Sequence, residues 1–180
     1  MEIKEGYMPF MGYQTYYRIV GKTEEGKSPI ILLHGGPGST HNYFELLDRV
    51  AESGRAVIMY DQLGCGNSFV EGHPELWTPE TWLNELCALI DYLHIDHFHL
   101  LGQSWGGMLA IIYLIEKKAK GVKSAILSST LSSSKLWASE QHRMIKFMSE
   151  EDQQAIAEAE VKDDFSSEAY AKANEHFMLL

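Results

Sequence analysis

The chain has 180 residues, of which 45% are hydrophobic and 22% charged, a composition typical of a globular domain with a sizeable core. Its formal net charge is −10, from 25 acidic and 15 basic residues, which argues against a nucleic-acid-binding surface built from clustered Lys and Arg. The longest apolar run, residues 108–115, is far shorter than the about 20 residues of a membrane-spanning helix.

The N-terminus lacks the basic segment and apolar stretch of a signal peptide. The two cysteines, Cys65 and Cys87, form neither a C-x-x-C pair nor a disulfide framework. These observations predict a soluble, cytoplasmic protein. Cys65 lies in a glycine-rich turn, where we weigh a reactive thiol against a small buried hydrophobic residue and favour the second.

The first part of the chain contains four segments that predict strands. Residues 7–12 and 14–21 are rich in Tyr and β-branched residues. Residues 30–33 (IILL) and 56–60 (AVIMY) are continuous apolar runs, as expected for strands that are buried on both faces of a sheet.

Two segments predict helices from apolar residues at helical spacing. Residues 40–54 end at Gly54, and their apolar positions are Phe44, Leu47 and Val50. In residues 78–95, Thr78 is suited to cap the helix and Pro79 to occupy its first position. The apolar face of this second helix consists of Trp82, Leu86, Leu89, Ile90 and Leu93.

The chain then continues to alternate strand and helix. Residues 97–101 predict a strand, an apolar helix follows through Ile115, and residues 122–129 predict another strand. This alternation is typical of a parallel sheet with helices on both faces. After Ser132 only helices are predicted, so we divide the chain into residues 1–132 and residues 133–180.

Three glycine-rich loops follow three predicted strands: HGGPG at 34–38, DQLGCG at 61–66 and GQSWGG at 102–107. Ligands bind parallel sheets at the carboxyl ends of the strands, so the three loops are expected to meet at one edge. Glycine allows the backbone to approach a ligand closely. The first loop matches no phosphate-binding pattern, and Pro37 removes a backbone donor, which argues against a phosphate site.

The third loop has the form G-x-S-x-G, which places Ser104 on a tight turn between a strand and a helix, with its hydroxyl exposed. The alternative is a Gly/Ser turn that matches by chance. A serine nucleophile needs a base and two donors for the oxyanion. In such a turn the donors are the backbone N–H groups of Trp105 and of Gly36 in the first loop.

The three loops, in this order and at these separations, resemble those of the prolyl aminopeptidase (proline iminopeptidase) group of α/β-hydrolases. The resemblance runs from about residue 1 to 132 and continues more loosely into the helical tail. It implies an α/β-hydrolase fold with a doubly wound, mostly parallel sheet and the start of a helical cap. It also implies a serine peptidase that releases an N-terminal residue, preferably proline, with no cofactor and no metal.

By position, the resemblance makes Ser104 the nucleophile that forms an acyl-enzyme. Gly36 and Trp105 supply the oxyanion hole, and Gly35 and the ring of Trp105 contact the substrate. The implied partners are small peptides or amino-acid amides with a free N-terminus, and neither nucleic acid nor membrane.

The resemblance places the triad acid and base after the cap, and it places the cap carboxylates that bind the substrate amine beyond residue 180. The histidines that follow Ser104, His142 and His176, are therefore not assigned to the triad. We expect the chain to be truncated, cleaved, or one half of a two-part assembly. Its expected protein partner is a missing C-terminal chain or further copies of itself in a homo-oligomer. Loss of the base in a comparable serine protease costs about 10⁶ in turnover, so the isolated chain is expected to be close to inactive.

Two alternative functions stay open. The first keeps the fold and makes the chain an esterase or amidase for small substrates. The second is a non-catalytic fragment that binds peptide or a partner chain.

Other polar residues have structural explanations. The histidines of HIDHFH at 94–99 lie at the amino end of the sheet, opposite the three loops, which argues against a metal site there. Asp61 is expected to tie down its own turn rather than to serve in catalysis. The resemblance gives His34 a structural role.

Overall fold

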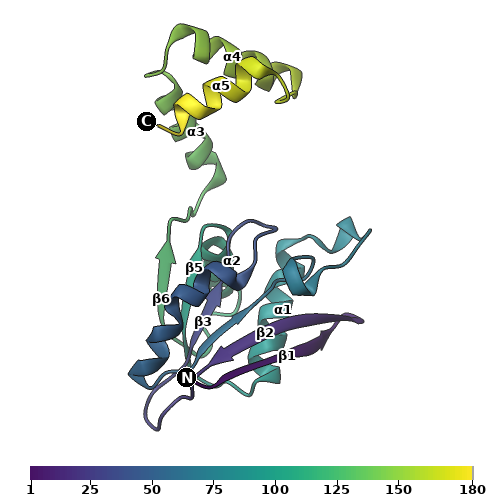
Figure 1. Cartoon of the computed structure of the whole chain (residues 1–180), viewed down its shortest axis with the longest axis vertical. Coiled ribbons are helices and arrows are strands. Elements are labelled where there is room, and N and C mark those ends of the chain that lie inside the picture. Colours follow the sequence, from purple (N-terminus) through teal and green to yellow (C-terminus); the bar gives the residue numbers. More distant parts are fainter. Residues whose placement is uncertain (180) are drawn as a thin grey trace. The chain divides into compact units, whose positions relative to one another are not determined.

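The computed structural model describes residues 1–179 and divides the chain into two compact units, Met1–Ser132 and a second unit that begins at Ser133. The first unit contains a six-stranded sheet with the order β1-β2-β4-β3-β5-β6 (Figure 1). Its strands are β1 (Ile3–Phe10), β2 (Tyr13–Val20), β3 (Ile30–Leu33), β4 (Val57–Tyr60), β5 (Phe98–Gln103) and β6 (Val122–Ser128).

Strands β4, β3, β5 and β6 run parallel, whereas β1 and β2 form an antiparallel hairpin that joins the sheet through β2 and β4. The mostly parallel sheet that the alternating sequence predicts is therefore confirmed. The carboxyl ends of β3, β4 and β5 carry the three glycine-rich loops, which places all three loops at the same edge of the sheet.

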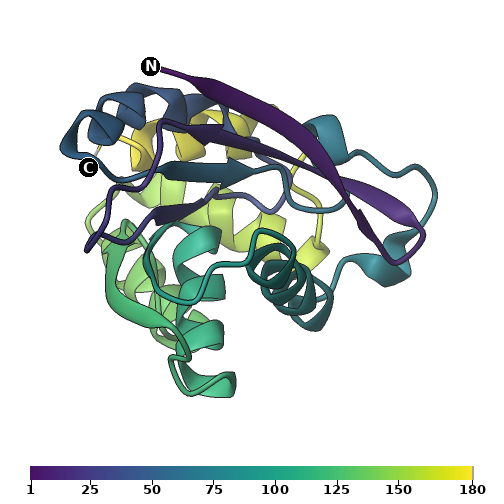
Figure 2. The same ribbon diagram turned by 90° about the horizontal axis from the view of Figure 1, so that it is seen from below.

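Helices cover both faces of this sheet, as Figure 2 shows. Helix η1 lies on one face, and α1 and α2 lie on the other. The helical segments of the first unit are η1 (His41–Ser53), η2 (Gly66–Ser68), η3 (Pro74–Leu76), α1 (Pro79–Tyr92) and α2 (Trp105–Glu116).

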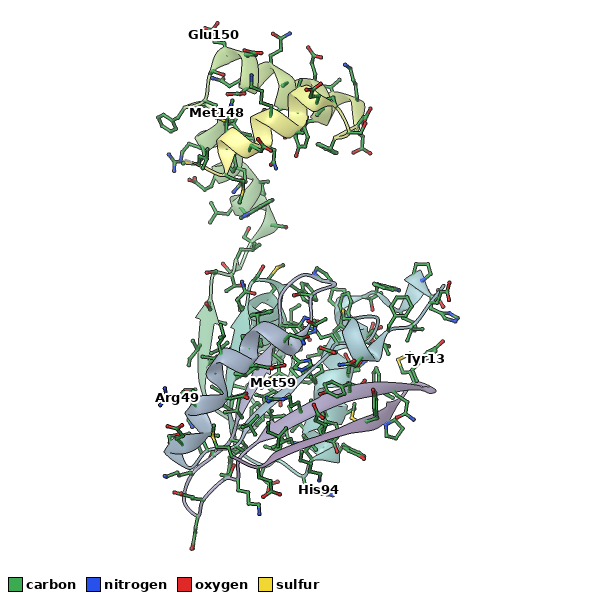
Figure 3. All side chains as sticks on the ribbon, viewed as in Figure 1. Tyr13, Arg49, Met59, His94, Met148 and Glu150 are labelled. Carbon is green, nitrogen blue, oxygen red and sulfur yellow. The ribbon has the colours of Figure 1, made fainter. Side chains whose placement is uncertain are left out.

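The alternating side chains of β3 supply both layers of the core. Ile31 and Leu33 pack with α1 and α2, whereas Ile30 and Leu32 pack with η1, because successive residues of a strand point to opposite faces. Met59 of β4 belongs to the η1 layer and is labelled in Figure 3. Complete burial of such side chains contributes about 1.5–3 kcal/mol each.

The η1 segment is a 3₁₀-helix rather than an α-helix. A 3₁₀-helix has three residues per turn, so Phe44, Leu47 and Val50 align along one face, and all three pack against the sheet. Gly54 ends the helix in the left-handed conformation, with φ of 76°, and its N–H donates to the carbonyl of Ala51.

Helix α1 begins as the sequence predicts. The Thr78 side chain caps it by accepting a hydrogen bond from the N–H of Thr81 at 3.2 Å, and Pro79 is the first helical residue. The predicted apolar face is buried, with Leu93 partly buried at its end.

The second unit consists of α3 (Ser134–Ile145), α4 (Glu150–Lys162) and α5 (Glu168–Phe177), as its sequence predicts. Each helix is capped by a serine, namely Ser133, Ser149 or Ser167, whose side chain accepts a hydrogen bond from a first-turn N–H. Within residues 1–179, no helix combines the length and the apolar character needed to cross a membrane.

Candidate active site

Ser104 occupies a strained backbone conformation at the junction of β5 and α2. Its φ is 51° and its ψ is −119°, a region that costs a non-glycine residue about 1–3 kcal/mol. Two hydrogen bonds hold this turn: the N–H of Ser104 donates to the carbonyl of Ser128 at 2.9 Å, and the Thr130 hydroxyl donates to the carbonyl of Ser104 at 2.7 Å. The structure therefore has the sharp strand-to-helix turn that the G-x-S-x-G pattern predicts.

The flanking glycines are required by the close crossing of strand and helix. A Cβ at Gly102 would overlap the backbone of Gly106, and a Cβ at Gly106 would overlap the carbonyl of Leu33 at the end of β3. These are backbone atoms, which cannot move aside cheaply. The turn at Ser104 is thus pressed against the beginning of the first glycine-rich loop.

Gly35 brings that first loop against the serine. A Cβ placed on Gly35 would lie 3.2 Å from the Cβ of Ser104 and 2.5 Å from Oε1 of Gln103. The N–H of Gly35 donates to the Tyr43 hydroxyl at 2.8 Å, and this hydroxyl donates to Oε1 of Gln103 at 2.9 Å. The Gly35 amide is therefore occupied within the fold.

Unlike the N–H of Gly35, the N–H groups of Gly36 and Trp105 are not engaged within residues 1–132. Within residues 1–132, no acceptor is seen for the N–H of Gly36, whose φ is 114°. Trp105 is the first residue of α2, so its N–H has no intrahelical acceptor and lies at the positive end of the helix dipole. Both amides are suited to bind an anionic oxygen, but their role in an oxyanion hole stays a prediction.

The Trp105 ring belongs to the core. It is only 8% exposed, packs edge-to-face on Trp82 with ring centroids 5.2 Å apart, and its Nε1–H donates to Oε1 of Gln62 at 2.9 Å. The aromatic contact and the hydrogen bond fix the orientation of the ring, and the expectation that it lines a substrate pocket stays a prediction.

His34 has the structural role that the resemblance implies. The ring is fully buried, and this burial lowers its pKa despite the nearby carbonyl of Gly35, so the ring is neutral. Nε2 accepts a hydrogen bond from the N–H of Gln62 at 2.9 Å. The ring proton is therefore on Nδ1, which donates to the carbonyl of Gly35 at 2.9 Å.

Asp61 ties down its own turn, as predicted. Its carboxylate accepts hydrogen bonds from the N–H and the ring of His41 and from the N–H of Asn67, at 2.7–2.9 Å. Burial acts to raise the pKa of Asp61, but these hydrogen bonds outweigh it and the pKa is lowered. The carboxylate is committed to the loop that follows β4.

The two cysteines are free, and the interpretation of Cys65 as a buried hydrophobic residue is confirmed. Its side chain is buried, and burial raises the pKa of the thiol to about 11. A thiol with this pKa stays protonated at neutral pH, which makes it a weak nucleophile.

The remaining histidines lie in other surroundings. His142 contacts Glu160 and His176 contacts Asp152, so both rings pair with carboxylates inside the second unit. His99 contacts Arg55 and Ser124. His94 lies at the end of the sheet opposite the loops, as Figure 3 shows.

Within residues 1–132, no side chain hydrogen-bonds the hydroxyl of Ser104.

Sequence reasoning missed the side chains that join the three loops. Gln62 links the second loop to His34 and Trp105. Tyr43 links Gly35 to Gln103, the residue before the serine. Gln62 and Gln103 both belong to quoted motifs. The sequence signal was present, but their partners lie far away along the chain.

Comparison with known proteins gives a consistent result. A model of the α/β-hydrolase fold family matches residues 28–177. The proline iminopeptidase of Clostridioides difficile is 66% identical over 178 residues, and that of Lactobacillus acidophilus is 62% identical over 180 residues. Each match covers 99% of this chain but 61% of the relative, so the chain spans about three fifths of their length.

Solved structures agree with these sequence matches. The proline iminopeptidase of Mycobacterium smegmatis superimposes with a TM-score of 0.82 at 30% identity, covering 96% of this chain and 59% of that one. The structure of VinJ gives the same TM-score at 34% identity, with the same coverage. The resemblance inferred from the three loops is thereby confirmed.

Proposed function

The chain belongs to the α/β-hydrolase fold family, and on that premise we propose that it carries the nucleophile of a serine aminopeptidase that releases an N-terminal residue, preferably proline, from small peptides. The observation that carries this proposal is the strained turn at Ser104, with the first glycine loop pressed against it. The similarity to proteins named proline iminopeptidase supports the substrate class.

In the proposed reaction, Oγ of Ser104 attacks the carbonyl carbon of the N-terminal residue. The hydroxyl proton passes to a general base, and the negative charge on the carbonyl oxygen is met by the N–H groups of Gly36 and Trp105. The departing amine takes a proton from the same base, which leaves the N-terminal residue esterified to Ser104. Water then hydrolyses the ester and restores the hydroxyl.

The resemblance assigns the base to a histidine that follows the cap. This fits the hydrogen-bond partners of His34, His142 and His176, each of which is engaged elsewhere. It also agrees with the greater length of the relatives, because this chain spans 61% of each of them. The substrate amine would be bound by carboxylates from the same later part of the protein. The proposed partners are thus peptides or amino-acid amides with a free N-terminus.

We test this proposal with the full-length protein, by which we mean this chain together with the later part that carries the proposed base. Turnover of proline p-nitroanilide and of p-nitrophenyl acetate is measured for this protein and for its Ser104→Ala variant. We expect Ser104→Ala to lower kcat on the anilide by about 10⁶, because the covalent intermediate no longer forms. Ser53→Ala, at an exposed position of η1, is the matched control and should retain full turnover. Cleavage of the ester alone would favour an esterase, and equal turnover by Ser104→Ala would contradict the nucleophile.

A further inference from the structure

Gln62 is fully buried at the centre of the three loops, and three of its hydrogen bonds reach the first and third loops. Its backbone N–H donates to Nε2 of His34 at 2.9 Å, and its side-chain Nε2 donates to the carbonyl of His34 at 3.0 Å. Its Oε1 accepts the indole N–H of Trp105 at 2.9 Å. One residue of the second loop therefore holds the first and third loops at the same time.

The backbone hydrogen bond from Gln62 to the His34 ring determines how the first loop presents the amide of Gly36. Because Nε2 of His34 accepts from the backbone N–H of Gln62, the ring proton is on Nδ1 and points to the carbonyl of Gly35. This carbonyl and the N–H of Gly36 belong to one planar trans peptide, in which they point in opposite directions. Fixing the Gly35 carbonyl on the buried ring thus turns the Gly36 N–H away from the core.

The bond to Trp105 acts on the second amide. The indole is held by Gln62 on one side and by the edge-to-face contact with Trp82 on the other. Trp105 begins α2 directly after Ser104, so a fixed indole fixes the position of its own N–H relative to the serine.

We propose that Gln62 is a positioning residue that sets the separation and direction of the two oxyanion-binding amides, Gly36 N–H through His34 and Trp105 N–H through the indole. This inference rests on the proposed function, because it assigns a role to the site around Ser104. Gln62 itself does not contact the reacting atoms. Its contribution appears in the transition state, where charge develops on the substrate oxygen.

Gln62→Met tests the proposal with little change in side-chain volume, since it removes both side-chain hydrogen bonds and keeps the backbone bond to His34. The backbone bond still fixes the His34 ring in this variant, so the expected effect falls on the Trp105 N–H. Removal of one oxyanion donor typically lowers kcat about 10²–10³-fold, so a misdirected Trp105 N–H should lower kcat on proline p-nitroanilide at least about tenfold. KM should change less than about twofold, because the effect falls on the transition state. Gln14→Met, at an exposed position of β2, is the control and should leave both constants unchanged.

Trp105→Phe removes the same hydrogen bond from the other side and keeps an aromatic ring. Both variants break the same hydrogen bond, between the indole of Trp105 and Gln62. The fold-decrease in kcat for the double variant Gln62→Met/Trp105→Phe should therefore be smaller than the product of the two single fold-decreases. Losses that multiply would overturn the proposal. Thermal unfolding shows whether Gln62→Met folds. If it does not, the kcat of Trp105→Phe alone still tests the role of this hydrogen bond.

The rate at which a fluorophosphonate labels Ser104 separates this inference from the function on which it rests. Its phosphoryl oxygen needs the same amides, so Gln62→Met should be labelled at least about tenfold more slowly than the wild type. Equal labelling of the two proteins would overturn the positioning role alone. No labelling of Ser104 in the wild type would overturn the serine hydrolase and, with it, the positioning role.

Discussion

At the scale of single residues, the first unit buries several ionisable groups, and their partners decide what each one does. The Asp61 carboxylate accepts hydrogen bonds from His41 and Asn67, and its pKa is lowered even though burial acts in the opposite direction. Glu85 of α1 is also fully buried, but its hydrogen bonds from Thr15 and Leu63 do not outweigh burial. Burial raises the pKa of Glu85 from 4.5 to about 7.

This difference makes Glu85 a source of pH-dependent stability. A carboxyl whose pKa is raised on folding binds its proton more tightly in the native state, so stability is lost as pH rises from about 4.5 to about 7. The shift corresponds to about 3 kcal/mol. Tyr60 and Cys65 lie near this carboxylate, and burial raises the pKa of each further above an ordinary value that already exceeds neutrality. Glu85 is therefore the member of this cluster that titrates in this range.

We predict that Glu85→Gln, which mimics the protonated form, changes the free energy of unfolding little at pH 5 but raises it by up to about 3 kcal/mol at pH 8. Urea unfolding at the two pH values measures this. Glu80→Gln, at an exposed position of the same helix, is the control and should follow the wild type at both. If the free energy of unfolding of Glu85→Gln changed with pH in parallel with that of the wild type, the raised pKa of Glu85 would be contradicted.

A second prediction concerns Cys65, whose thiol has a pKa of about 11 because it is buried. In the folded protein at pH 8 it should react with a disulfide reagent such as dithionitrobenzoate much more slowly than in urea, where the thiol is exposed. Cys65→Ser identifies the signal by removing it, with Cys87 remaining. Rapid reaction of Cys65 in the folded chain would contradict its buried position.

At the scale of elements, the decisive feature is the crossing of β5 and α2 over the end of β3. Gly102 and Gly106 have no side chain because the backbone of another element occupies that space. The same contact brings Gly35 within reach of Ser104. The G-x-S-x-G pattern is therefore a packing requirement as well as a chemical one.

Gly106→Ala should destabilise the first unit by at least about 2 kcal/mol, since its Cβ would overlap the carbonyl of Leu33 and force β3 and α2 apart. Gly26→Ala is the matched control, because a Cβ at Gly26 meets nothing and only the positive φ of 77° costs about 1 kcal/mol. Thermal unfolding compares the two. A smaller loss for Gly106→Ala than for Gly26→Ala would show that the crossing is looser than described.

At the scale of the whole molecule, most of the architecture follows from sequence pattern. Buried strands such as β3 and the capped start of α1 depend on neighbouring residues, so apolar runs and Thr78-Pro79 predict them. The loops of the site could be placed at one edge because parallel strands leave no other arrangement.

The side-chain connections within the site could not be predicted. Gln62 and Trp105 are 43 positions apart, and Tyr43 and Gln103 are 60 apart, so no local pattern pairs them. For the same reason, the contacts that hold the Trp105 ring against Trp82 and Gln62 could not be predicted. Tertiary contacts of this kind decide which donors remain for a ligand.

The central claim is that Ser104 is a nucleophile, and the mass of a covalent adduct tests it most directly. The full-length protein, treated with a fluorophosphonate and digested, should carry one adduct on the peptide that contains Ser104, and Ser104→Ala should carry none. This result would establish an activated serine at the turn between β5 and α2. An adduct on another residue, or an unmodified Ser104 peptide in folded protein, would contradict the account.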